Sequence, residues 1–320
     1  MISTENRMRR LAFAKYLIEM GTINADNVLP YSAMAILNFH DAIEFLFDLI
    51  LEDNGSSANN FNFMGCFDEI NRILKKIGKD QSSFRGSLEK LKDRRVVLKH
   101  KGSFPSQNDI SEAKYTTINL FKEFCLKFYN LNYEDIDLVE LLEDSRTKDC
   151  LLKIRNCEDN NVITDNFALA FAYLLKDFEN SKIINVYESP YQFTKNMSLG
   201  STDGLSDEFD FLKDFMDTTN QNIESLEYNL KIIALGIDYN KYAKFNFLIP
   251  ADIRWAMNND DPMILFRYKP VKLNDNQIEF CKNFIIESAL KLQQFDFEIP
   301  DDFALTNSMN VPLTNFFKMD

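Results

Sequence analysis

The chain has 320 residues, of which 45% are hydrophobic and 29 are phenylalanine, so it carries enough apolar surface for a sizeable core. Only 9 glycines and 8 prolines are present, which argues against turn-rich all-β architectures and against disorder on a large scale. The formal net charge of −13 repels nucleic acid at long range. Any nucleic-acid site must therefore be a local basic patch.

Three features that the sequence lacks, namely an apolar membrane span, a signal peptide and paired cysteines, indicate the cellular compartment. No run of about 18 apolar residues is present, so we expect no transmembrane helix and no membrane partner. Lys15 and Glu19 interrupt the apolar stretch near the N-terminus, which is typical of an amphipathic helix rather than a signal peptide. The 5 cysteines are scattered and form no C-x-x-C pair, so we predict neither a zinc site nor a disulfide framework. We expect a cytoplasmic protein in a reducing compartment, with no metal and no cofactor.

The first half of the chain predicts five successive helices. Apolar residues recur there at helical spacing over residues 5–20, 29–52, 61–77, 84–100 and 106–129. The second of these has a broad apolar surface, which is typical of the central helix of a bundle. Ser82 or Ser83 is expected to cap the fourth. Five helices joined by short loops favour a compact bundle.

After Asn130 the pattern changes. Further helices are predicted over residues 134–157, 166–180, 219–235 and 274–294. FNFLIP and MILFRYKP, at residues 245–250 and 263–270, look like short strands, each stopped by a proline.

Proline, glycine, serine and aspartate gather near residues 186–208, and this composition predicts a mobile loop or linker. The sequence thus predicts a mainly α fold. An N-terminal helical bundle is expected over residues 1–130. An α-rich C-terminal region of unknown role, with a few short strands, is expected over residues 131–320.

Residues 85–101 form a strongly basic segment in this acidic chain. Seven basic residues stand against two acidic ones, a net charge of +5, which leaves −18 for the remainder. The segment also holds His100, one of only 2 histidines. Its basic residues are Arg85, Lys90, Lys92, Arg94, Arg95, Lys99 and Lys101. Such charge asymmetry predicts a site that binds phosphate.

Spacing alone does not bring Arg95 and His100 together. Five residues on an undistorted helix leave an angular offset of about 140°. Convergence needs a kink or helix end near residues 99–102, or a symmetric dimer interface. The structural alternative is that His100 only favours the dipole at a helix C-terminus, while Arg94 and Arg95 pair with surface acids.

The string RVVLKHKG at residues 95–102 resembles the Arg–(four to six residues)–His signature of HEPN domains. These are compact helical bundles found in many prokaryotic toxins and antiviral effectors. The Lys-His-x-Gly ending, followed by Pro105, looks like a variant of that signature. NFHDAIEFLFDLI is similar to the family's long early helix, with Ala42 and Glu44 as a loose match to its Ala-x-x-Glu setting. The resemblance covers about residues 5–130.

The resemblance implies metal-independent RNA cleavage in a cleft formed by two HEPN domains. His100 would act as general acid or base, because an imidazole titrates near neutral pH. Arg95 would hold the phosphate oxygens and stabilise their charge. The other residues that it implies are Arg94, Lys99 and Lys101, which would contact the RNA backbone, and Glu44, which would line the cleft.

Three functions stay open. The first is a homodimeric HEPN-like endoribonuclease that acts as a toxin or abortive-infection effector, with an antitoxin or defence-system protein as partner. The alternative is a catalytically inactive HEPN-like scaffold or sensor subunit that binds a protein partner. Val96 and Val97 favour it, because many HEPN members carry a polar residue there. The third is an unrelated helical adaptor that binds a basic partner through the acidic half of the chain.

His40, Asp41 and Glu44 form a second cluster of titratable residues. His40 and Glu44 are i, i+4 neighbours and share one helix face. They fit either an acid–base cluster or a buried, hydrogen-bonded core histidine, and the second interpretation is the better supported.

Overall fold

The computed structural model describes residues 2–143, 145–182, 191, 193, 199–200, 210–255 and 262–294. The chain divides into two compact units, Met1–Glu143 and Asp144–Asp320. The described part is mainly helical, as predicted, and its strands form a single antiparallel pair near the C-terminal end. Within these residues no helix is long and apolar enough to cross a membrane.

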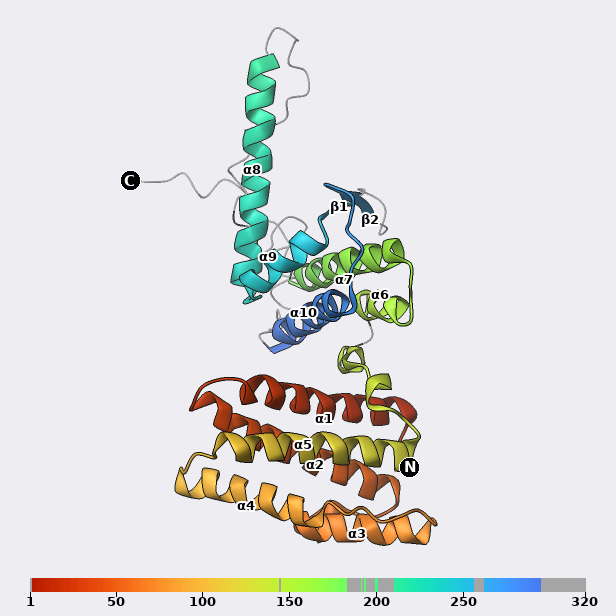
Figure 1. Ribbon diagram of the computed structural model, residues 1–320. Helices are drawn as coiled ribbons and strands as arrows, with labels where there is room; N and C mark the ends of the chain where they lie inside the picture. Colours follow the sequence, from red (N-terminus) through yellow and green to blue (C-terminus); the bar gives the residue numbers. More distant parts are fainter. Residues whose placement is uncertain are drawn as a thin grey trace, which may run out of the picture. The chain divides into compact units, whose positions relative to one another are not determined.

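The first unit is a helical bundle (Figure 1). Its helices are α1 (Thr4–Ala25), α2 (Met34–Asp53), α3 (Phe63–Lys76), α4 (Arg85–Lys101) and α5 (Gln107–Phe124). The 3-10 turns are η1 (Tyr31–Ala33), η2 (Ala58–Asn60), η4 (Tyr133–Asp135) and η5 (Leu138–Leu141), and a π-helical turn η3 (Cys125–Tyr129) extends α5. The five helices predicted for this half are confirmed.

Helix α2 lies at the centre of this bundle, as its broad apolar surface predicted. It contacts α1, α3, α4 and α5, and eleven of its residues are buried. The Phe47 ring packs against Phe67 and Phe124, with ring centroids 6.2 and 6.1 Å apart. A helix that is apolar on most of its surface is stable only where other helices cover it, which fixes α2 inside the bundle.

The first unit continues past residue 130, where the sequence analysis placed the boundary, and ends at Glu143. The predicted helix over 134–157 is wrong in its first part, because η4 and η5 occupy it. Asp137 accepts a hydrogen bond from the Val139 amide and starts a 3-10 turn. Leu138 and Val139 are buried, and η5 contacts α1, so these turns complete the first unit.

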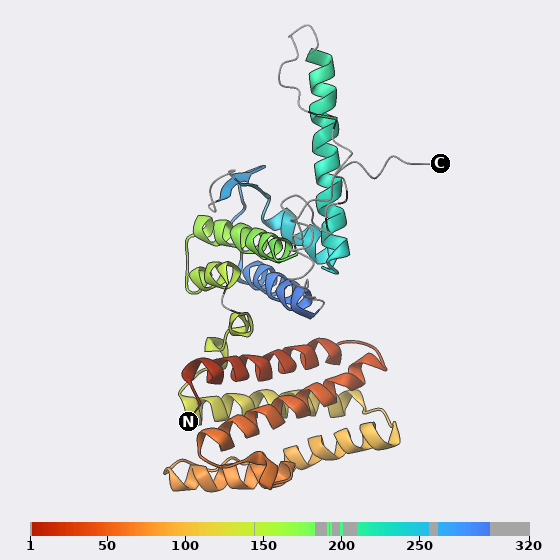
Figure 2. The same cartoon turned by 180° about the vertical axis from the view of Figure 1, so that it is seen from behind.

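The second unit holds the remaining helices and the hairpin (Figure 2). These are α6 (Arg146–Ile154), α7 (Asn160–Asn180), α8 (Asp210–Ala234), α9 (Tyr239–Leu248), β1 (Ala251–Trp255), β2 (Pro262–Phe266) and α10 (Asp275–Gln294). Strands β1 and β2 are antiparallel, with Ala251 opposite Phe266. The core centres on Phe171, Phe245 and Phe284, whose ring centroids lie 5.0–5.3 Å apart.

One strand prediction is wrong and one is confirmed. FNFLIP lies mostly in α9, since Asp238 accepts hydrogen bonds from the Asn240 and Lys241 amides and caps a helix there. Phe245 then faces the core while Phe247 is exposed. MILF belongs to β2, as predicted. The predicted loop or linker near 186–208 lies outside the described residues except for a few positions.

Candidate functional site on helices α2 and α4

Helix α4 carries the basic segment. Leu88 and Leu91 are its fully buried residues and anchor one face on the bundle. The predicted serine cap is wrong: Phe84 occupies the N-cap position without a side-chain hydrogen bond. The Ser82 amide donates a hydrogen bond to Asn71 Oδ1, and the Ser82 hydroxyl donates one to Glu123 Oε2, so Ser82 does not cap the helix. The helix ends where Gly102 adopts a left-handed conformation.

Arg95 occupies the bundle-facing side of α4. It stands four residues after Leu91 and seven after Leu88, which places all three on one helix face. Its side chain is half-buried, and its Nε atom is buried without a hydrogen-bond partner among the described residues. Burying a guanidinium nitrogen without a hydrogen bond destabilises the fold, so Arg95 is a candidate for a functional rather than a structural role.

His100 lies on the last turn of α4 and is exposed. The helix is continuous from Arg85 to Lys101 and ends only at Gly102, so the helix end near residues 99–102 follows His100 and does not turn it toward Arg95. The two side chains therefore keep the offset of about 140° of a regular helix. Within one chain, α4 presents Arg95 and His100 on different faces.

Arg94 binds helix α5. Its Nη2 atom lies 2.7 Å from Asp109 Oδ1 and 2.5 Å from Glu112 Oε2, and the side chain is only 16% exposed. The hydrogen bond from Arg94 lowers the pKa of Glu112 below its usual range, and Lys90 contributes to this shift. Arg94 thus joins α4 to α5 within the chain, and its predicted contact with RNA stays a prediction.

Lys99 and Lys101 are exposed and flank His100 in the last turn of α4. Neither makes an ion pair or side-chain hydrogen bond with a residue that the structure describes. The negative end of the helix dipole favours cations at this terminus. This end of α4 is therefore a compact positive group held on a rigid element.

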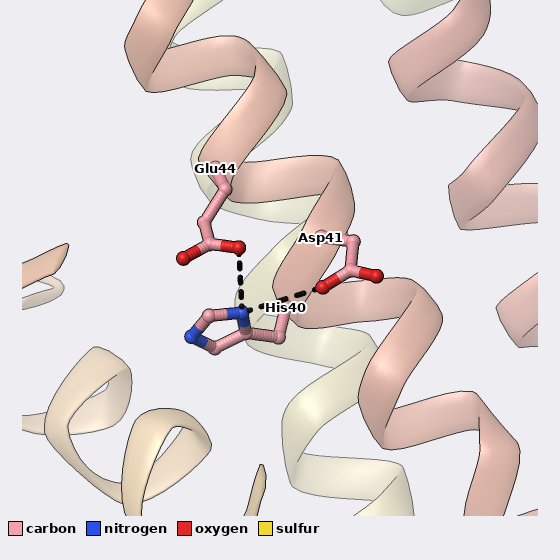
Figure 3. A group of neighbouring side chains, drawn as sticks. All are labelled: His40, Asp41 and Glu44. Atoms are coloured by element: carbon pink, nitrogen blue, oxygen red, sulfur yellow. Dashed lines mark ion pairs between the residues drawn. The ribbon is translucent and has the colours of Figure 1, made fainter. Parts of the chain in front are cut away.

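A second cluster, made of His40, Asp41 and Glu44, lies on α2 (Figure 3). The His40 side chain is 2% exposed and stacks on Phe63, with ring centroids 4.3 Å apart. Its Nδ1 atom lies 3.4 Å from Glu44 Oε2 and 3.7 Å from Asp41 Oδ1. The prediction of a buried histidine is confirmed. However, Nδ1 makes no hydrogen bond of good geometry with the described residues.

The electrostatics of His40 connect the two helices. Burial lowers the pKa of His40, but the Asp41 and Glu44 carboxylates outweigh burial and raise the pKa above its usual value. The Arg95 guanidinium opposes them, since a nearby positive charge disfavours a second one. Arg95 and His40 lie on helices that contact each other, α4 and α2. The HEPN resemblance implied a cleft shared by Arg95 and Glu44, and His40 was not part of it.

A signal for the grouping of His40 with Glu44 was present in the sequence. The i, i+4 spacing of His40 and Glu44 placed them on one face of a helix with a broad apolar surface. No local pattern predicted that α4 would cross α2 at that level, because the contact is set by packing of distant segments.

A cavity of about 220 Å³ lies in the second unit, between α9 and α10. Lys241 and Glu287, which form an ion pair, line it together with Phe284. None of the residues predicted to form a site lines this cavity.

Comparison with protein-family models, with curated proteins and with solved structures found no match to this chain.

Proposed function

We propose that this chain is a HEPN-like, metal-independent endoribonuclease that acts as a toxin or antiviral effector. The main support is a group of four cationic or titratable side chains on α4 that make no ion pair with described residues. These are Arg95, Lys99, His100 and Lys101. Elsewhere on the same helix, Arg85, Lys90 and Arg94 are paired with carboxylates. Unpaired cations in a chain of net charge −13 suit an anionic ligand such as the RNA backbone.

Arg95 is assigned the phosphate. A guanidinium can donate two parallel hydrogen bonds to phosphate oxygens and stabilise the charge that builds on them during cleavage. Packing of α4 on α2 restrains the half-buried side chain, so less order remains to be imposed when the ligand binds.

His100 is assigned proton transfer. The RNA 2′-hydroxyl attacks the adjacent phosphorus, the bond from phosphorus to the 5′-oxygen breaks, and a cyclic phosphate and a 5′-hydroxyl result. One histidine accepts the proton of the 2′-hydroxyl, or donates one to the leaving oxygen. Because α4 separates Arg95 and His100 around its axis, the proposal pairs Arg95 of one copy with His100 of a second copy across a two-fold axis.

The unbroken course of α4 also favours the alternative, a catalytically inactive scaffold or sensor subunit. In that case the basic end of α4 would contact an acidic protein partner. Val96, which is 37% exposed, gives this helix an apolar surface position where a polar residue would serve catalysis better.

One experiment separates these functions. The full chain is incubated with total RNA in EDTA, beside Arg95→Ala, His100→Ala and Lys92→Ala. Lys92 is the control, because its replacement removes one partly exposed positive charge, which pairs with Asp93, from the same helix. We expect cleavage by the wild type and by Lys92→Ala, and a loss of at least about 100-fold in the other two variants. Equal cleavage by all four, or none by any of them, would overturn the assignment.

A further inference from the structure

We propose that His40, Asp41 and Glu44 form a binding site for a divalent transition-metal cation such as Zn²⁺. This goes beyond the proposed ribonuclease activity, which needs no metal. The scattered cysteines, which form no C-x-x-C pair, had predicted that no metal is bound. The structure instead presents one imidazole nitrogen and two carboxylate oxygens within 4.8 Å of one another. Nitrogen and oxygen donors of these types bind Zn²⁺ in proteins.

The distances suit a shared ion. Zn²⁺ bonds to histidine nitrogen and carboxylate oxygen are about 2.0–2.2 Å long, so two ligands of a tetrahedral ion lie roughly 3.3–3.6 Å apart. His40 Nδ1 lies 3.4 Å from Glu44 Oε2 and 3.7 Å from Asp41 Oδ1. Small rotations of the Asp41 and Glu44 side chains would complete the tetrahedral geometry. These two side chains are half exposed and can rotate, whereas packing fixes the His40 ring.

The unsatisfied His40 nitrogen also supports a metal site, independently of the distances between the ligand atoms. His40 is 2% exposed, and its Nδ1 atom points toward both carboxylates without a hydrogen bond of good geometry to any described residue (Figure 3). When Nδ1 binds an ion through its lone pair, the ion lies on the lone-pair axis and the carboxylate oxygens that share it lie to one side of that axis, where they make poor hydrogen bonds with Nδ1. The arrangement that leaves Nδ1 unsatisfied is thus the one that a metal would satisfy.

An ion can reach the site from solvent, and the position of the His40 ring is fixed. The side chains of Asp41 and Glu44 are each 47% exposed, so an ion can reach them from solvent. Stacking on Phe63 holds the imidazole ring in place. Three protein ligands leave a fourth position for water, as in zinc sites that are not purely structural.

Calorimetric titration of the full chain with ZnCl₂ at neutral pH tests the proposal without RNA. We expect one site whose Kd rises at least about 10-fold in Glu44→Gln and in Asp41→Asn, because each removes one ligand. Glu52→Gln is the control: it neutralises an exposed carboxylate on the same helix, outside the cluster, and should leave Kd unchanged. Glu44→Gln is preferred to a His40 variant because Glu44 is at the surface and its loss leaves the core intact.

Co²⁺ distinguishes this site from binding to cysteine. Bound Co²⁺ should show the visible absorption of a tetrahedral nitrogen and oxygen site without a thiolate charge-transfer band. A thiolate band, Zn²⁺ binding that Glu44→Gln leaves unchanged, or no binding by the wild type would each overturn the proposal. None of these results depends on RNA cleavage, so the metal site and the ribonuclease can fail separately.

Discussion

At the scale of single residues, Arg94 and Arg95 show how neighbours on a helix acquire different roles. Arg94 is 16% exposed and pairs with Asp109 and Glu112. Arg95 faces α2 and has a buried Nε atom without a partner in the described residues. The sequence predicted a basic segment but could not distinguish the two, because the distinction depends on which face of α4 meets α5 and which meets α2.

Arg94→Ala should destabilise the chain while Lys90→Ala should not. Arg94 is only 16% exposed, and its loss removes the ion pairs with Asp109 and Glu112 that join α4 to α5, at a cost of about 1–3 kcal/mol. Lys90 pairs with the same Glu112 but is 61% exposed, so its removal should cost less than about 0.5 kcal/mol. Urea unfolding followed by circular dichroism measures both. Equal midpoints for the two variants would contradict this role for Arg94.

Asp53 should make part of the stability depend on acid pH. Burial raises the pKa of Asp53, but two hydrogen bonds from Arg7 and one from the Ile2 amide outweigh it and hold the pKa below its usual value. The unfolded chain therefore binds this proton at higher pH than the folded one. The contribution is complete above about pH 4 and is lost as the pH falls through the lowered folded pKa.

The variant Asp53→Asn tests this pH dependence. It should be less stable than the wild type at pH 7 by about 1–2 kcal/mol, because the ion pair with Arg7 is lost. The difference should shrink as the pH falls below about 4 and through the lowered folded pKa of Asp53. Urea midpoints measured from neutral to acid pH give the comparison. A difference that stays constant over this range would show that Asp53 acts through packing instead.

At the scale of elements, periodicity predicted the long helices of the first unit and missed α9, a short capped helix of the second unit. α2 could be predicted because its apolar surface extends over many turns. FNFLIP alternates like a strand, yet the capping hydrogen bonds of Asp238 and the burial of Phe245 against Phe171 hold it in α9. The packing of α4, which carries Arg95, against α2, which carries the His40 cluster, could not be predicted, because it joins segments that are distant in the sequence.

Asp238→Ala should weaken α9. Its carboxylate accepts hydrogen bonds of 2.9 and 3.0 Å from the Asn240 and Lys241 amides, and loss of such a cap costs about 0.5–2 kcal/mol. Asn240→Ala, at an exposed neighbouring position, is the control and should be near neutral. The single tryptophan, Trp255 in β1, reports unfolding of this unit by fluorescence. A midpoint that Asp238→Ala leaves unchanged would contradict the capping role.

At the scale of the whole molecule, charge separates one helix from the rest of the chain. The segment 85–101 carries +5 in a chain of −13, and its unpaired cations lie in the C-terminal half of α4. Composition predicted this asymmetry, and the structure places it on a continuous helix. Because that helix cannot turn Arg95 and His100 of one chain onto a single face, the proposed ribonuclease requires two copies.

Complementation between Arg95→Ala and His100→Ala tests this central claim most directly. In a mixed dimer, the His100→Ala chain supplies an intact Arg95 and the Arg95→Ala chain supplies an intact His100, so one of the two shared sites is complete. Random pairing during co-expression makes about half of the dimers mixed, so about one quarter of the wild-type cleavage in EDTA should return. Two different affinity tags, one on each variant, isolate the mixed dimers, and no cleavage by these dimers would contradict the account.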